Sequence, residues 1–162
     1  MLNQDQNLFQ ALNELYDGTE MFNSIAGQLD KITQASLDHQ AKLVLDEAVE
    51  LKDSGTDKVN ALKEAIDVLV TTFGYIQKLG LAYDCDIAEA MNLVNGNNLS
   101  KFSEDPEDLM ESVRFYMEKG VKVDVQYDED SGLYSLKDES GKVRKPVWYQ
   151  DCDLSSCFET LQ

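Results

Sequence analysis

Two pairs of acidic residues on consecutive helical patterns constrain the fold of this chain most. Glu47 and Glu50 are three residues apart, and so are Glu64 and Asp67. Residues three apart lie on the same face of an α-helix, so each pattern presents two carboxylates side by side. Residues 53–57, between the pairs, are types that end one helix and cap the next. The sequence therefore predicts an antiparallel helical hairpin whose acidic pairs meet near one end.

Each predicted helix also carries an apolar stripe. The first stripe comprises Leu37, Ala41, Val44, Ala48 and Leu51, and the second Val59, Leu62, Ile66, Leu69 and Phe73. On the second helix the acidic face, shared by Glu64, Asp67 and Thr71, lies away from the stripe, and other apolar residues flank it. A helix that is apolar nearly all round is usually buried, and buried carboxylates need a counter-charge.

No lysine is expected to supply that counter-charge. Lys52, Lys58 and Lys63 are close in sequence, but none falls on the acidic face of the second helix. We therefore expect a metal ion between the two helices. The alternative is an ordinary solvated face, because Glu and Asp are common on the surfaces of helices.

The residue types that are missing indicate which metal is expected. The chain has a single histidine, His39, and its three cysteines, Cys85, Cys152 and Cys157, show no CxxC spacing. Zinc prefers nitrogen and sulfur ligands, and a ferritin-like di-iron bundle needs Glu-x-x-His pairs. Four carboxylates favour Mg²⁺, with Mn²⁺ as the alternative. Since Mg²⁺ usually completes its shell with water and substrate phosphates, a phosphate ester or nucleotide is the expected substrate.

Net charge excludes some partners. The 162 residues include 14 Lys and Arg against 31 Asp and Glu, a formal charge of −17, which repels polymeric nucleic acid and anionic membranes. Small nucleotides remain compatible, because a bound Mg²⁺ reverses the local field. No apolar run is long enough to span a membrane, and the first residues lack the features of an export signal, so we expect a cytoplasmic protein. The three cysteines agree with a reducing compartment.

The rest of the chain reads as a mainly α fold of four to five helices with a small β-hairpin. Residues 7–29 predict one or two helices, Ser36 and Asp57 are expected N-caps of the acidic hairpin, and Gly80 is the expected end of its second helix. A helix is expected after Asp105-Pro106 and a hairpin within residues 121–136. We therefore predict a helical domain at 1–120, with a β appendage and tail at 121–162 packed on it.

Polar groups of another kind follow the fourth helical pattern. Asn98 offers an amide and Lys101 a cation, in an asparagine-rich stretch that reads by default as a helix end and loop. A lysine near a metal-bound polyphosphate would contribute a point charge to it.

At these residues the chain resembles a known superfamily, the all-α nucleoside triphosphate pyrophosphohydrolases. This MazG-like superfamily also includes phosphoribosyl-ATP pyrophosphohydrolase and the dimeric dUTPases. Its signature is Glu-x-x-Glu followed by Glu-x-x-Asp on the next helix, which residues 47–50 and 64–67 match. Residues 97–101 and 141–146 are similar to segments of phage-type members with a C-terminal extension. Many members have Glu-Glu where this chain has Asp46-Glu47, which leaves the role of Asp46 open.

The resemblance implies a MazG-like helical bundle and an enzyme. The expected reaction cleaves a nucleoside triphosphate between the α and β phosphates, giving the monophosphate and pyrophosphate. Glu47, Glu50, Glu64 and Asp67 would bind Mg²⁺, and Glu47 or Glu50 would orient or deprotonate the attacking water.

The resemblance also implies substrate contacts and an assembly. Asn98 and Lys101 would contact the phosphates or sugar, and we place the base near Phe22 and Asn23, although Phe22 also suits a core position. A homodimer or homotetramer is implied, in the host cytoplasm if the chain is phage-encoded.

Other functions remain open at this level. Within the superfamily, a dUTPase-type or a phosphoribosyl-ATP activity uses the same scaffold, for nucleotide-pool control, house-cleaning or histidine biosynthesis, and fold does not settle the substrate. In a different class, a chain of charge −17 suits an acidic, non-enzymatic DNA mimic. A mimic needs acid spread over its surface, whereas the enzyme needs its four acids gathered in one place.

Overall fold

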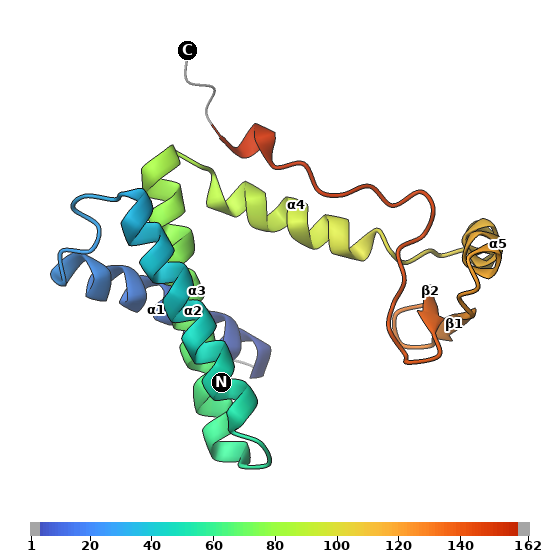
Figure 1. Ribbon diagram of the computed structural model, residues 1–162, viewed down its shortest axis with the longest axis horizontal. Helices are drawn as coiled ribbons and strands as arrows, with labels where there is room; N and C mark the ends of the chain where they lie inside the picture. The colour runs from blue at the N-terminus through green and yellow to red at the C-terminus, as the bar shows by residue number, and fades with distance from the viewer. Residues whose placement is uncertain (1–3, 159–162) are drawn as a thin grey trace. The chain divides into compact units, whose positions relative to one another are not determined.

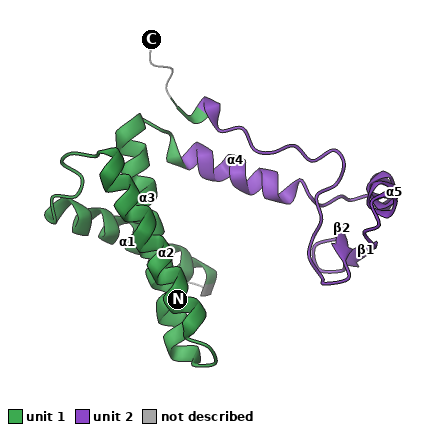
Figure 2. Cartoon of the chain, viewed as in Figure 1, with its two compact units in different colours: residues 1–87, 157–162 green, residues 88–156 purple. Residues whose placement is uncertain are grey.

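The computed structural model describes residues 4–158 and is mainly helical, with a two-stranded antiparallel hairpin toward its C-terminal end (Figure 1). This confirms the predicted fold class at that level. The chain divides into two compact units (Figure 2): unit 1 runs to residue 87 and takes up the chain again at 157, and unit 2 spans 88–156. The predicted boundary at residue 120 falls within unit 2, because the helix before it packs against the hairpin that follows.

Unit 1 begins with helix α1, Gln4–Ile25, which is a single helix across the predicted interruption at Gly18. It packs against the third helix of the unit. The ring of Tyr16 meets that of Phe73 edge-on at 5.3 Å, and Gln77 Nε2 donates to the Tyr16 carbonyl at 2.9 Å. α1 thereby covers part of the acidic hairpin.

Helices α2, Gln34–Asp53, and α3, Lys58–Tyr83, form the predicted hairpin. Asp57 caps α3 as expected, since its Oδ1 accepts from the backbone N–H groups of Val59 and Asn60, both at 3.1 Å. The N-cap of α2 is Thr33 rather than Ser36. Each of these two residues accepts a hydrogen bond from the other's backbone N–H, so Ser36 is the third residue of a capping box.

The end of α3 also differs from the prediction. The helix continues past Gly80 to Tyr83, and Asp84 takes the left-handed conformation, φ 49°, that closes it. The glycine at position 80 is explained by packing instead. A Cβ there would lie 3.1 Å from Ile87 Cγ1, so the absent side chain lets the following segment approach α3.

The two faces of α3 differ in burial. Its acidic face packs against α2, with Glu64 only 4% exposed, whereas Val59 and Leu62 in the apolar stripe are 83% and 65% exposed. The expectation that this helix is buried, because it is apolar nearly all round, therefore holds for Glu64 and is wrong for most of the stripe. In unit 1, α1 and α2 pack against the polar side of α3, and α1 also meets Phe73 of the stripe. The other members of the stripe are exposed: Val59, Leu62, Ile66 and Leu69.

Unit 2 surrounds a small apolar core. Its elements are α4 (Ile87–Leu99), whose first residue belongs to unit 1, a 3₁₀ turn (Pro106–Leu109), α5 (Met110–Glu118), β1 (Val123–Asp128) and β2 (Leu133–Asp138). A short 3₁₀ turn, Ser155–Cys157, follows. Asp105 caps the first turn before Pro106, as predicted. β1 and β2 pair antiparallel from Val123 opposite Asp138 to Asp128 opposite Leu133, and Leu109, Val123 and Leu136 are buried between hairpin and helix.

Within residues 4–158, none of the helices combines the length and apolar character that crossing a membrane requires.

Candidate metal centre

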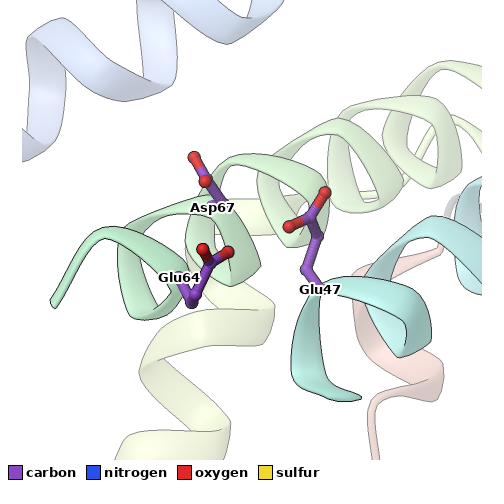
Figure 3. Close-up of side chains that lie close together, drawn as sticks. All are labelled: Glu47, Glu64 and Asp67. Atoms are coloured by element: carbon purple, nitrogen blue, oxygen red, sulfur yellow. The ribbon is translucent and has the colours of Figure 1, made fainter. Parts of the chain in front are cut away.

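Three of the four predicted carboxylates come together in the hairpin of unit 1. Glu47, Glu64 and Asp67, here called the acid trio, each offer one oxygen, and these oxygens lie within 4.8 Å of one another. Figure 3 shows Glu47 reaching from α2 toward Glu64 and Asp67 on α3. Of the residues that the structure describes, this is the group of acidic, histidine and cysteine side chains that could hold a metal ion.

Glu64 is the most deeply buried member of the trio. Its Oε1 accepts from Lys63 Nζ at 3.0 Å, but its Oε2 is buried without a hydrogen-bond partner. An unsatisfied buried acceptor costs about 1–3 kcal/mol, and more when it carries charge. An orphaned oxygen on a member of the trio fits a bound cation.

Lys63 supplies part of the counter-charge, contrary to the prediction that no lysine shares this face. Its Nζ lies 3.0 Å from Glu64 Oε1 and 2.8 Å from Asp67 Oδ2. The pKa of Lys63 is raised, first by the hydrogen bond to Asp67 and then by that to Glu64. The side chain is 62% exposed, so solvent weakens both ion pairs. Lys63 comes four residues before Asp67, a spacing that makes their side chains neighbours on the helix surface, which the face assignment overlooked.

Glu47 lies close to other negative charges. Its pKa is raised, mainly by desolvation and then by the charges of Glu50, Asp67 and Glu64. Each of these charges opposes ionisation of the Glu47 carboxyl, and a divalent cation would relieve them all. The electrostatics of the trio thus favour a positively charged ligand.

Glu50 is the predicted ligand that the trio does not include. It is exposed on α2, one turn from Glu47, and it acts on Glu47 through its charge. Asp46, whose role the sequence leaves open, forms an ion pair with Lys42 four residues earlier. Of the three neighbouring acids of α2, Glu47 therefore belongs to the trio, and Asp46 and Glu50 do not.

The donor set of the trio is entirely carboxylate oxygen. Hard oxygen ligands suit Mg²⁺ or Mn²⁺, and His39, exposed on α2, is not part of the group. The residues present therefore fit the kind of ion expected from the sequence.

The predicted substrate residues lie in both units. Asn98 and Lys101 belong to unit 2, where Lys101 Nζ donates to Asn98 Oδ1 at 2.8 Å and lies 5.4 Å from the centre of the Tyr149 ring. Their role toward the acid trio stays a prediction. Phe22 and Asn23 are on α1 in unit 1, and the exposure of Phe22 is inconsistent with the alternative of a core position.

Phe22 and Asn23 line a cavity of about 380 Å³, here called the hairpin cavity. Its walls come from α1, α2 and α3 and the loop after α1: Glu14, Leu15, Gly18, Thr19, Phe22, Asn23, Gln28, Gln40, Leu43, Val70 and Thr71. Sequence reasoning missed its polar members Gln28 and Gln40, which belong to no motif. The one available signal was the position of Gln40 on the helical face of Leu37 and Val44.

The chain was compared with protein-family models, with curated proteins and with solved structures, and none of them matches it.

Proposed function

We propose that this chain is a Mg²⁺-dependent nucleoside triphosphate pyrophosphohydrolase that cleaves between the α and β phosphates. The observation that carries the proposal is the acid trio with its orphaned, deeply buried Glu64 Oε2. Carboxylate clusters of this kind bind the metal ions that phosphate chemistry uses. The resemblance of residues 47–50 and 64–67 to the MazG-like signature supports this choice of reaction.

The residues of the hairpin take distinct roles in this proposal. Glu47, Glu64 and Asp67 hold Mg²⁺, which when bound neutralises phosphate charge and acidifies a water molecule. Glu64 is fixed by burial, so it sets the position of the ion. Glu50 lies one turn from Glu47 and outside the trio, and we assign it to accept the proton of the attacking water.

We assign Asn98 and Lys101 to contacts with the phosphates or the sugar, and this assignment rests on the resemblance alone. The natural substrate is a ribo- or deoxynucleoside triphosphate, with nucleotide-pool control or house-cleaning as the purpose. A dUTPase-type or phosphoribosyl-ATP activity would use the same carboxylates, and the substrate panel below separates these activities.

An assembly of two or four copies is part of the proposal. The apolar stripe of α3 leaves Val59, Leu62, Ile66 and Leu69 exposed at spacings of three and four residues. Such a seam is typical of helices that pack against a partner helix. A second copy would bury it.

The non-enzymatic DNA mimic is the competing class. It rests on the charge of −17, but it gives no reason for a buried carboxylate with an unpartnered oxygen. Convergence of three acids in unit 1 therefore favours a cation site over a uniformly acidic surface.

The test is pyrophosphate release from a panel of ribo- and deoxynucleoside triphosphates, dUTP and phosphoribosyl-ATP in the presence of Mg²⁺. We expect release by the native chain and a loss of at least about hundredfold for Glu64→Gln and Asp67→Asn, since even indirect partners of a metal site contribute ten- to hundredfold. Asp53→Asn, an exposed carboxylate on α2, is the control for the change of charge. Unchanged release by both trio variants would refute the site, and no release from any substrate would refute the enzyme.

A further inference from the structure

The hairpin cavity lies beside the acid trio along both helices of the hairpin. On α2, Leu43 in the cavity wall comes four residues before Glu47, and on α3, Thr71 comes four residues after Asp67. Because the helices are antiparallel, both steps lead in the same direction, and four residues of helix span about 6 Å. A molecule that has its phosphates at the trio would have its next group at the mouth of this cavity.

A buried lysine fixes how two amides of the cavity are turned. Lys78 on α3 is 2% exposed, and its Nζ donates to Gln40 Oε1 at 2.7 Å and to Gln28 Oε1 at 3.2 Å. A lysine ammonium group only donates, and a carboxamide accepts through its oxygen and not through its NH₂ group. The two carboxamide oxygens therefore face Lys78. The groups that Gln28 and Gln40 can offer to the cavity are therefore NH₂ groups.

Two further features strengthen the donor character of this wall. Gln40 Nε2 uses one proton on the Thr71 carbonyl at 3.0 Å, which leaves the second. Asn23 is 5% exposed, lines the cavity, and its Nδ2 is buried without a partner. Gly74 permits this crowding of amides, because a Cβ there would lie 3.1 Å from both Asn23 Nδ2 and Gln40 Nε2.

We propose that the hairpin cavity takes the base of the substrate and selects a keto base, which carries a carbonyl oxygen, over an amino base at the corresponding ring position. This inference rests on the proposed function and deepens it. Uracil, thymine and guanine present an acceptor where cytosine and adenine present an NH₂ donor. A donor-rich wall pairs with the first group, while an amino group facing it leaves donors on both sides unpaired.

The rest of the cavity suits a flat ring. Leu15, Phe22, Leu43 and Val70 provide apolar surface on α1, α2 and α3. Pockets for small ligands commonly combine such walls with a few oriented polar groups. The amides of Gln28 and Gln40, held by Lys78, are the oriented polar groups here. Lys78 is therefore a positioning residue.

The experiment measures binding of nucleoside monophosphates to the full chain with Mg²⁺, by isothermal titration calorimetry. Two pairs matched in ring size are compared, dUMP with dCMP and dGMP with dAMP. We expect the keto member of each pair to bind at least about tenfold more tightly, the discrimination that an oriented hydrogen-bond donor provides.

Isosteric variants test the amides themselves. Gln28→Glu and Asn23→Asp each replace a donor by an acceptor, and both should bring the two affinity ratios close to one. Gln28 is exposed and a carboxylate there gains Lys78 as its counter-ion, so this variant keeps its fold. Thermal unfolding of each variant confirms that the chain is intact.

A steric variant tests the location. A Cβ at Gly18 would meet nothing within 4 Å, so Gly18→Leu should project into the cavity and weaken all four monophosphates by about tenfold or more. Asn13→Leu, at an exposed position of the same helix, is the matched control.

Equal binding of the keto and amino members, unchanged ratios in Gln28→Glu and Asn23→Asp, or no binding of any monophosphate would overturn the inference. Its failure is distinct from that of the proposed function. Pyrophosphate release without base discrimination would refute only the selection of keto bases. Keto-selective binding without pyrophosphate release would refute the proposed enzyme activity and leave the cavity as a base-binding site.

Discussion

The two units of this chain differ in whether they bury charged side chains. In unit 2, Leu109, Val123 and Leu136 are shielded by α5 and the hairpin, as in an ordinary small core. In unit 1, the buried side chains include Glu64 and Lys78, while most of the apolar stripe of α3 is exposed. Burying polar groups costs free energy unless they are paired. The core of unit 2 thus pays no such cost, whereas unit 1 buries charged groups that its proposed metal site would help to compensate.

The largest contrast between the units is expected from truncating leucines. Leu136→Ala in unit 2 should lower the free energy of unfolding by about 2–5 kcal/mol, because a fully buried leucine leaves a cavity. Leu62→Ala, on the exposed stripe of α3, should cost less than about 1 kcal/mol at low protein concentration. Urea denaturation, read out by hydrogen exchange in each unit, measures both. Equal losses of unfolding free energy in the two variants would contradict the difference in burial between the units.

The stripe of α3 gives the second prediction. Leu62→Asp should weaken self-association by about 1.5–3 kcal/mol, the contribution of one buried leucine, and shift the chain toward monomer in analytical ultracentrifugation. Asn60→Asp adds the same charge to the same helix and serves as control. A native chain that is monomeric at all concentrations would contradict this use of the stripe.

Glu64 provides a prediction that runs against the usual effect of a core substitution. Without metal, Glu64→Gln should raise the free energy of unfolding by about 1–3 kcal/mol, because it removes a buried and only partly compensated charge. The native chain should instead gain stability with Mg²⁺, by about 2.7 kcal/mol at a hundredfold excess over Kd. Thermal unfolding with EDTA and with Mg²⁺ gives both values. Destabilisation of the metal-free variant would show that Glu64 is adequately paired by Lys63.

The smallest effect concerns pH and unit 2. The Ser140 hydroxyl, two backbone N–H groups and Arg144 lower the pKa of Asp138 to about 2. Because the pKa is depressed in the folded state, this contribution to stability is present above the ordinary aspartate value near 4 and is lost as pH falls toward 2. Asp138→Asn should flatten the acid limb of hairpin stability, measured by hydrogen exchange of β1. An identical acid limb in the variant would contradict the assignment.

The sequence predicted the features that depend on local chemistry. Asp57 caps α3 and Asp105 precedes Pro106 because short side chains at these positions satisfy free N–H groups. The alternation from Val121 to Tyr127 predicted the β-hairpin. Glu64 and Asp67 lie together because residues three apart share a helix face, and the antiparallel hairpin brings Glu47 to them.

The predictions that were wrong concern which face of a helix packs against its neighbours. We expected α3 to be buried because it is apolar nearly all round, but most of its apolar stripe is exposed. Periodicity does not say whether an apolar face packs within one chain or against another. Lys63 and Lys78 were missed for a related reason, since long side chains bring their charges far from their own backbone position.

Direct binding of a divalent ion tests the central claim. Mn²⁺ can replace Mg²⁺ at oxygen sites, and its free fraction is measured by electron paramagnetic resonance as the chain is titrated. We expect tight binding by the native chain and by Asp53→Asn, and its loss in Glu64→Gln and Asp67→Asn. Equal Mn²⁺ binding by all four chains would contradict a metal centre at Glu47, Glu64 and Asp67.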